Sequence, residues 1–279
     1  MSRLTDLLET KFSSKGGLTR LVCRLPPDKL PLAAAILAEG IARQRIGVNK
    51  RLFRQWNDRR LNSTSDSATP GDLKVLEAGL LQDLGTPASP GSDKHLHGLV
   101  AEAIWYLVVS DLPVGPGRPI RVEAHDWSVT DPGGDGLTVY TTANGGYCFR
   151  LWESKHHGTT KKVRKTVNSA CRQIKSRSLS YLTRFSLVAH EISEDEDLAR
   201  FYGSLAELWV NRDASAGVGV SIGVSTGANT SQCFGNVTSY FDLKPAQHQA
   251  HLHLMDDFGE LARLVRSEIW KGCGVWIAP

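Results

Sequence analysis

The spacing of apolar and polar positions predicts alternating helices and strands along most of the chain. Two segments rich in Ser, Thr, Pro and Gly, at 62–71 and 85–93, interrupt this pattern and predict loops. The expected strands cover 120–129, 135–142, 147–156, 185–190 and 218–225, with one or two more within 1–60. The expected helices cover 32–41, 73–84, 96–109 with Asp93 as a candidate N-cap, 161–175, 194–208 and 246–270. The polar stretch 43–60 either continues the first helix or follows a short turn. This order predicts an α/β or α+β core built on a mixed central β-sheet flanked by helices.

The composition limits the class of protein. The chain has 279 residues, of which 41% are hydrophobic and 22% charged, which excludes disordered, collagen-like and coiled-coil chains. No apolar run approaches the roughly 18 residues that span a bilayer. The N-terminal segment contains Asp6 and Glu9 and no long apolar stretch, so we expect no secretory signal. Five cysteines without a CxxC pair favour free thiols in a cytoplasmic protein.

Charge is distributed unevenly along the chain. Nine Lys or Arg and no Asp or Glu occur in 155–184, and seven basic residues against one acidic residue occur in 41–60. Five acidic residues then crowd into 191–197. Concentrated positive charge beside a cleft attracts polyanions and is typical of nucleic-acid binding. A solvated basic helix face is the alternative interpretation.

Three segments carry candidate chemistry. Glu102 lies in the strongly apolar helix, where an ionised carboxylate is costly unless it is paired, metal-bound or placed on a polar stripe. Asp135 lies among glycines where a strand begins, a position that also suits a simple turn. Glu153, Ser154 and Lys155 end an apolar strand, and alternation places Glu153 and Lys155 on one face. An exposed ion pair, which contributes little to stability, is the alternative for the last two residues.

In this order and on these elements, Glu102, Asp135, Glu153 and Lys155 resemble the motif of the PD-(D/E)xK nuclease superfamily. That family places a Glu on a helix, an Asp on a strand and Glu-x-Lys at the end of the next strand. The resemblance covers about 95–190, and Gly134 stands where a literal motif has Pro. It implies a restriction-endonuclease-like core over 91–279 with C-terminal strand and helix additions, preceded by an N-terminal accessory segment over 1–90.

The resemblance also implies a metal-dependent reaction. Mg²⁺, for which Mn²⁺ can substitute, prefers oxygen ligands and keeps several waters. Asp135, Glu153 and the backbone carbonyl of Ser154 would hold it, and Glu102 would bind a second ion or a metal-bound water. Lys155 would orient and deprotonate the attacking water or neutralise the charge on the phosphorane.

The length of the loop between the two motif strands determines whether Asp135 lies on the same face of the sheet as Glu153. If Asn144-Gly145 formed a two-residue turn, Asp135 would face Ser154, on the wrong side of the sheet from Glu153. A three-residue loop, or a bulge near Gly136, would bring Asp135 opposite Glu153 or Lys155. We therefore predict one of these irregularities.

The expected helix after the motif would line the cleft. Its candidate phosphate contacts are Lys161, Lys162, Arg164, Lys165, Arg172 and Lys175. Some branches of the family carry a Gln near the active site on this helix, which makes Gln173 an auxiliary candidate.

Other chemistries are less well supported by the sequence. His251 and His253 lie on an expected helix, where residues two apart do not face each other, and no Cys pairs with them at zinc spacing. The Gly-rich stretch 217–227 has no GxGxxG before a helix and no Walker Lys. We therefore expect no small-molecule cofactor, and any motor that moves DNA would belong to another chain.

The function implied by the resemblance is that of a Mg²⁺-dependent deoxyribonuclease. Within the superfamily the layout is most similar to the HamA nuclease subunits of the Hachiman anti-phage defence systems. That similarity implies an effector that works in a complex with a helicase (ATPase) partner. A non-catalytic DNA- or partner-binding module on the same fold, and a stand-alone restriction endonuclease, are the alternatives.

Overall fold

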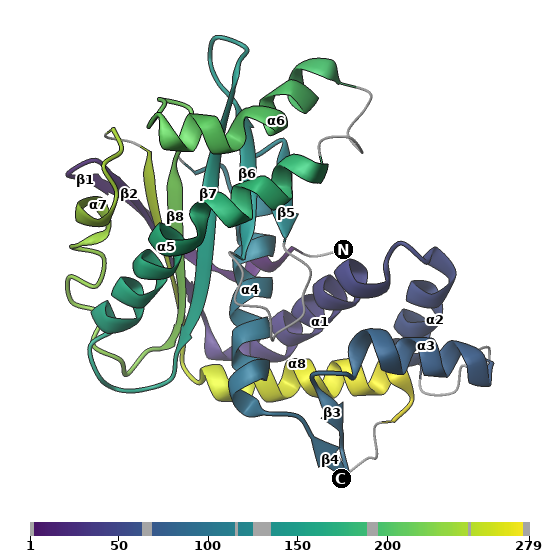
Figure 1. Cartoon of the computed structure of the whole chain (residues 1–279). Helices are drawn as coiled ribbons and strands as arrows, with labels where there is room; N and C mark the ends of the chain where they lie inside the picture. Colours follow the sequence, from purple (N-terminus) through teal and green to yellow (C-terminus); the bar gives the residue numbers. More distant parts are fainter. Residues whose placement is uncertain are drawn as a thin grey trace.

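The computed structural model of the chain describes residues 3–62, 69–114, 117–124, 135–188, 195–244 and 247–275. They form a mixed α/β fold in which helices flank a seven-stranded sheet (Figure 1), as the sequence predicted. The sheet strands are β1 (Glu9–Lys15), β2 (Leu18–Leu25), β5 (Arg121–Ala124), β6 (Gly136–Thr141), β7 (Tyr147–His157), β8 (Val218–Ser225) and β9 (His248–Met255). A separate small hairpin consists of β3 (Gly85–Thr86) and β4 (Ser89–Pro90). The helices are η1 (Leu4–Leu7), η2 (Pro27–Lys29), α1 (Leu30–Ile46), α2 (Lys50–Leu61), α3 (Pro70–Leu80), α4 (Asp93–Asp111), α5 (Arg164–Val188), α6 (Glu196–Val210), α7 (Val237–Tyr240) and α8 (Phe258–Cys273).

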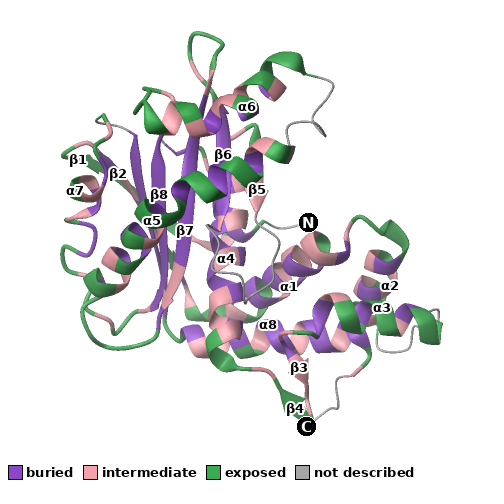
Figure 2. Ribbon diagram, in the orientation of Figure 1, coloured by how far each residue is buried: buried purple, intermediate pink, exposed green. Residues whose placement is uncertain are grey.

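The sheet has a parallel centre and antiparallel edges. Its order is β1-β2-β9-β8-β7-β6-β5, and the pairs β2–β9, β9–β8 and β8–β7 are parallel. The pairs β1–β2, β7–β6 and β6–β5 are antiparallel. Strand β8 is buried at its first seven positions, which explains its nearly continuous apolar sequence. Figure 2 shows these buried central strands and the exposed outer sides of α5 and α6.

Neighbouring side chains of β7 point to opposite layers. Leu151 packs in the core that α5 and α6 form on one face of the sheet. Trp152 packs against Trp105 of α4 on the other face, with ring centroids 5.9 Å apart. Helices α1, α2, α3 and α8 extend this second layer through a shared core with α4. The end of β7 therefore lies between α4 and α5, the two helices that carry the remaining candidate residues.

The N-terminal segment takes part in this architecture. Strands β1 and β2 belong to the seven-stranded sheet, and α1 packs against α8. The predicted boundary between an accessory segment over 1–90 and a core over 91–279 stays a prediction.

Two predicted elements were wrong. The expected helix over 246–270 is strand β9 followed by α8. His251 and His253 alternate with Ala250, Leu252 and Leu254, which is a strand pattern that the expected helix overlooked. The expected strand over 185–190 is helical as far as Val188, since α5 continues past residue 175. Tyr181, Leu182 and Phe185 have helical spacing and are buried in the core beneath α5.

Smaller differences concern the ends of elements. Ser92 occupies the N-cap position of α4, and Asp93 is its first helical residue. The negative charge of Asp93 there interacts favourably with the positive end of the helix dipole. The expected strand over 120–129 is observed as β5, and 125–134 lies outside the described residues. All five cysteines are free and buried. Within the described ranges, no helix combines the length and the apolar character needed to cross a membrane.

Candidate active site

The loop of the β6–β7 hairpin sets the position of Asp135. Thr142 donates its amide to the carbonyl of Gly146 at 2.7 Å, which leaves three residues in the loop. Gly145, the last of them, has a φ of +79°, a conformation that glycine adopts without strain. The ladder pairs Gly136 with Trp152, and one further step places Asp135 opposite Glu153. Of the two irregularities that the sequence predicted, the three-residue loop is present, and the two-residue hairpin that would have separated the carboxylates is absent from this segment.

Backbone hydrogen bonds hold Asp135 against the end of β7. The amide of Asp135 donates to the carbonyl of Trp152 at 3.1 Å. One carboxylate oxygen of Asp135 accepts a hydrogen bond from the amide of Ser154. The side chain of Asp135 is therefore fixed next to the Glu-x-Lys segment without using the side chains of Glu153 or Lys155.

Gly136 allows α4 to approach β6 closely. A Cβ atom at this position would lie 2.1 Å from Cη2 of Trp105 and 2.7 Å from the carbonyl oxygen of Glu123. Trp105 is three residues after Glu102 and therefore lies on the same side of α4. This approach brings the carboxyl group of Glu102 within hydrogen-bonding reach of Asp135. A glycine that sequence analysis attributed to a turn thus has a packing role at the site.

Lys155 links β7 to α5. Its Nζ atom donates to Oε1 of Glu153 at 2.7 Å and to Oε1 of Gln173 at 2.9 Å. The side chain of Glu153 is only 1% exposed, whereas that of Lys155 is 25% exposed. The ammonium group therefore lies at the solvent side of a buried carboxylate. All five candidates, including the auxiliary Gln173, converge on one place.

The carboxyl groups of Glu102, Asp135 and Glu153 lie close together, and the ammonium group of Lys155 does not fully offset the mutual repulsion of their charges. Burial raises the pKa of Asp135 to about 7, and burial together with the charge of Asp135 raises the pKa values of Glu102 and Glu153 well above their usual range. Burial alone would lower the pKa of Lys155, but the neighbouring charge of Glu153 and its hydrogen bond outweigh that effect and raise it. The cluster would release protons in exchange for a bound cation.

One buried oxygen is available for such a cation. Oε2 of Glu153 is buried and has no hydrogen-bond partner. Across the described ranges, no group of three or more His, Cys, Asp or Glu side chains is arranged so that it could hold a metal ion. Oxygen ligands on Asp135 and Glu153 nevertheless suit Mg²⁺, which binds through one or two carboxylates and completes its octahedron with water and phosphate oxygens. Asp135 and Glu153 therefore fit a magnesium ion that takes two ligands from carboxylates and the others from water and phosphate.

No protein-family model matches the chain, and no curated protein matches it.

The basic segment forms the exposed start of α5 and the turn before it. The six predicted phosphate contacts are all exposed: Lys161, Lys162, Arg164, Lys165, Arg172 and Lys175. His157 at the end of β7 fixes the turn into α5, with Nδ1 2.7 Å from Oγ1 of Thr166 and Nε2 3.0 Å from the carbonyl oxygen of Lys161. A surface depression on α5 is lined by Ser169, Arg172, Gln173, Lys175, Ser176 and Arg177. Gln173 thus joins the basic surface to the carboxylate cluster.

Two further residues near the carboxylate cluster, Arg45 and Tyr181, were not predicted from the sequence. Arg45 of α1 has a side chain only 8% exposed, pairs with Asp83 at 3.1 Å and acts on the pKa of Glu102. Tyr181 of α5 shares a side-chain hydrogen bond with Gln173. No motif marks either residue, because each reaches the site through tertiary packing.

His251 and His253 were assigned to a helix and are instead on β9. They share one face of the strand, their ring centroids lie 6.0 Å apart, and both are fully buried. Nε2 of His253 lies 3.1 Å from Oγ of Ser221, whereas both ring nitrogens of His251 have no hydrogen-bond partner. The two rings therefore lie on the same side of a strand, and the expectation that helical spacing would separate them was wrong.

Proposed function

We propose that the chain is a Mg²⁺-dependent nuclease that hydrolyses phosphodiester bonds in DNA. The observation that carries the proposal is the convergence of Asp135, Glu153 and Lys155, with Glu102 beside them, at the end of β7. This arrangement of carboxylates around one ammonium group suits the cleavage of a phosphate ester. The exposed basic residues of α5 support an anionic polymer as substrate.

Asp135 and Glu153, together with the carbonyl oxygen of Ser154, would hold the Mg²⁺ ion, and Mn²⁺ would substitute. Bound there, the ion would supply positive charge that lowers the pKa of a water molecule and offsets charge developing on the phosphate. Glu102, whose carboxyl group lies within hydrogen-bonding reach of Asp135, would bind a second ion or a metal-bound water molecule. The unpartnered Oε2 of Glu153 supports this assignment, since a buried carboxylate oxygen without a hydrogen bond is stabilised by a bound cation.

Lys155 would place positive charge at the reacting phosphate. Its ammonium group has three N–H donors, of which Glu153 and Gln173 accept two. The third donor can reach a phosphate oxygen or the attacking water. Gln173 would hold the ammonium group in place while Arg172 and Lys175, on the same helix, bind neighbouring phosphates.

The biological role rests on the resemblance to the HamA nuclease subunits. We propose a cytoplasmic effector of a prokaryotic anti-phage defence complex that works with a helicase partner. The absence of a Walker motif from the sequence supports an external motor. Because an unrestrained nuclease would harm its host, we expect a partner or a trigger to control it.

The test compares wild-type protein with the Glu153→Ala/Lys155→Ala variant on supercoiled plasmid DNA in Mg²⁺, Mn²⁺ or EDTA. The matched control is Asp197→Ala/Arg200→Ala, which removes an exposed ion pair of 3.0 Å on α6. We expect metal-dependent nicking or degradation by wild type and control, and none by the first variant. Cleavage that persists in the first variant would show that the residues are wrongly assigned.

A second measurement separates a restrained nuclease from a binding module. We expect Mg²⁺ to raise the thermal unfolding midpoint of wild type and of the control, but not of the Glu153→Ala/Lys155→Ala variant. No cleavage combined with no metal-dependent shift would favour the non-catalytic module. A defined fragment pattern on plasmid DNA would instead favour a stand-alone restriction endonuclease.

A further inference from the structure

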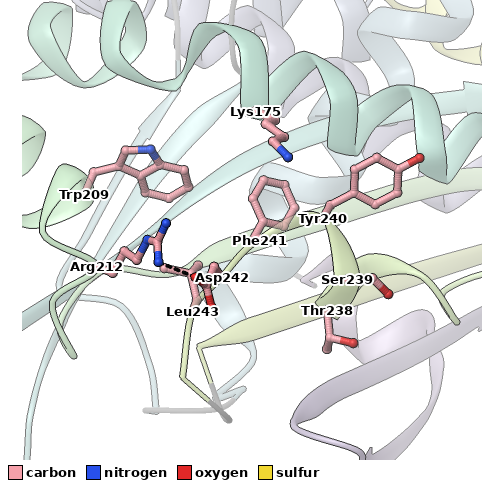
Figure 3. Close-up of a pocket in the computed structure, with 9 residues that line it drawn as sticks. All are labelled: Lys175, Trp209, Arg212, Thr238, Ser239, Tyr240, Phe241, Asp242 and Leu243. Atoms are coloured by element: carbon pink, nitrogen blue, oxygen red, sulfur yellow. Dashed lines mark hydrogen bonds and ion pairs between the residues drawn. The ribbon is translucent and has the colours of Figure 1, made fainter.

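A second hollow lies beside α5, away from the carboxylate cluster. It has a volume of about 450 Å³ and is lined by Lys175, Trp209, Arg212, Thr238, Ser239, Tyr240, Phe241, Asp242 and Leu243. These residues come from α5, from the end of α6 and from the segment around α7 (Figure 3). The volume falls within the range of pockets that hold small organic groups.

Three aromatic rings form the walls of this hollow. The centroid of Phe241 lies 6.3 Å from that of Trp209 and 6.4 Å from that of Tyr240. Phe241 is buried, whereas Trp209 and Tyr240 are half-buried, and all three line the hollow. Flat apolar walls of this kind suit a planar ring such as a nucleobase, which gains stacking energy on Trp and Tyr.

The charged groups at the rim favour an anionic ligand. Arg212 pairs with Asp242, so these two side chains largely cancel each other. Lys175 is exposed, and its ammonium end points toward the ring of Phe241 (Figure 3). The net charge contributed by these three side chains is therefore positive, which suits a phosphate attached to the stacked ring.

Lys175 also connects the hollow to the candidate active site. It lines both this hollow and the depression on α5 that contains Gln173. Gln173 in turn accepts a hydrogen bond from Lys155. A polynucleotide backbone that crosses α5 from the carboxylate cluster would therefore reach the aromatic walls.

We propose that this hollow binds an unpaired base of single-stranded DNA. Bases of a duplex are stacked on their neighbours and cannot enter such a hollow, whereas unpaired bases stack readily on aromatic side chains. The inference rests on the proposed nuclease function and gives it a substrate class. The preferred substrate is DNA with a single-stranded stretch, whose backbone crosses α5 while one base lies against Trp209, Tyr240 and Phe241.

The experiment measures binding in EDTA, so that it does not depend on cleavage. The probes are a fluorescein-labelled 12-nucleotide thymidine strand, a strand of equal length made of abasic sites, and a 12-base-pair duplex. The protein variants are Trp209→Ala and the matched control Val210→Ala, whose side chain is exposed on the same helix and does not line the hollow. Fluorescence anisotropy gives the Kd of each pair.

We expect wild type and Val210→Ala to bind the thymidine strand about tenfold more tightly than the abasic strand, since only the former can stack. Trp209→Ala should lose most of this difference, because phosphate contacts remain and the stacking wall is gone. The duplex should bind more weakly than the thymidine strand. Equal binding of the thymidine and abasic strands by wild type, or a difference that survives in Trp209→Ala, would overturn the proposal.

A conservative variant guards against misfolding of Trp209→Ala. An unlabelled thymidine strand should quench part of the tryptophan emission of wild type, and Trp209→Phe should keep the affinity but lose that part of the quench. An unchanged quench in Trp209→Phe would also overturn the proposal. Failure of the nuclease function has a different signature, namely plasmid cleavage that is absent or that persists in Glu153→Ala/Lys155→Ala.

Discussion

Lys155 on β7 and Gln173 on α5 are joined by a hydrogen bond of 2.9 Å between Nζ and Oε1. This contact ties the ammonium group of the motif to the helix whose exposed side chains are basic. Because Glu153 accepts a second hydrogen bond from the same Nζ atom, the ammonium group has a defined position before any substrate binds.

Replacing Gln173 by Ala should lower kcat more than it raises KM. The variant keeps Lys155 and Glu153 but removes one of the two acceptors that position the ammonium group. We expect kcat for plasmid nicking to fall about tenfold while KM changes less than about twofold. Ser180→Ala, an exposed substitution on the same helix, serves as the control. A change confined to KM would mean that Gln173 contacts DNA and does not position Lys155.

Gly136→Ala should separate α4 from β6. The new Cβ atom would overlap the ring of Trp105 and the carbonyl oxygen of Glu123, so the helix that carries Glu102 must move. Overpacking of this kind costs about 1–3 kcal/mol, and the thermal midpoint should fall by about 3–10 °C. Cleavage should be lost as well, since Glu102 would no longer reach Asp135.

Gly98→Ala is the matched control for this substitution. Gly98 lies one turn before Glu102 on α4, and nothing lies within 4 Å of a Cβ atom at that position. Alanine is favoured over glycine within a helix, so Gly98→Ala should leave the midpoint unchanged or raise it, with cleavage retained. Equal effects of the two substitutions would show that the close packing at Gly136 does not matter.

The sequence predicted those parts of the site that depend on strand periodicity. Alternation along β7 was sufficient to place Glu153 and Lys155 together, and the need to bring Asp135 to them predicted the irregular hairpin. Strand periodicity could not predict that α4 approaches β6 through Gly136 and Trp105. Those two residues are far apart in the chain, and their contact depends on tertiary packing.

The errors in the fold have a related cause. His251 and His253 alternate with Ala250, Leu252 and Leu254, a pattern that predicts a strand with one solvated face, but β9 is buried on both faces by α4, α8 and the core beneath α5. His251 and His253 therefore occupy buried strand positions, although the sequence had been expected to place them on a helix. The hollow lined by Trp209 and Phe241 was not predicted for a similar reason, since its walls come from separate elements.

The exposed basic residues of α5 should contribute to DNA affinity through counterion release. Each phosphate contact that is lost lowers the slope of log K against log salt concentration by about 0.7–0.9. We expect Lys165→Gln/Arg172→Gln to weaken binding of a short DNA strand in EDTA and to lower the slope by about 1.5. Arg200→Gln on α6 is the control, because Arg200 is also exposed but is paired with Asp197. An unchanged slope in the double variant would exclude these two residues from the DNA-binding surface.

His253, one of the buried histidines on β9, should make the fold sensitive to acid. Burial lowers the pKa of His253 to about 3, whereas an unfolded histidine has a pKa near 6.5. His253 therefore contributes stability that is fully present above about pH 6.5 and is lost as the pH falls toward 3, by up to about 1.4 kcal/mol for each pH unit. We expect the free energy of unfolding of wild type to fall between pH 6.5 and pH 4.

Ser221→Ala/His253→Leu, which removes the ring and its hydroxyl partner together, should show a shallower fall. Ser221→Ala alone keeps the histidine and should keep the wild-type slope, so denaturant unfolding of the three proteins at several pH values checks the assignment. A slope that is the same in all three proteins would place the acid sensitivity elsewhere in the molecule.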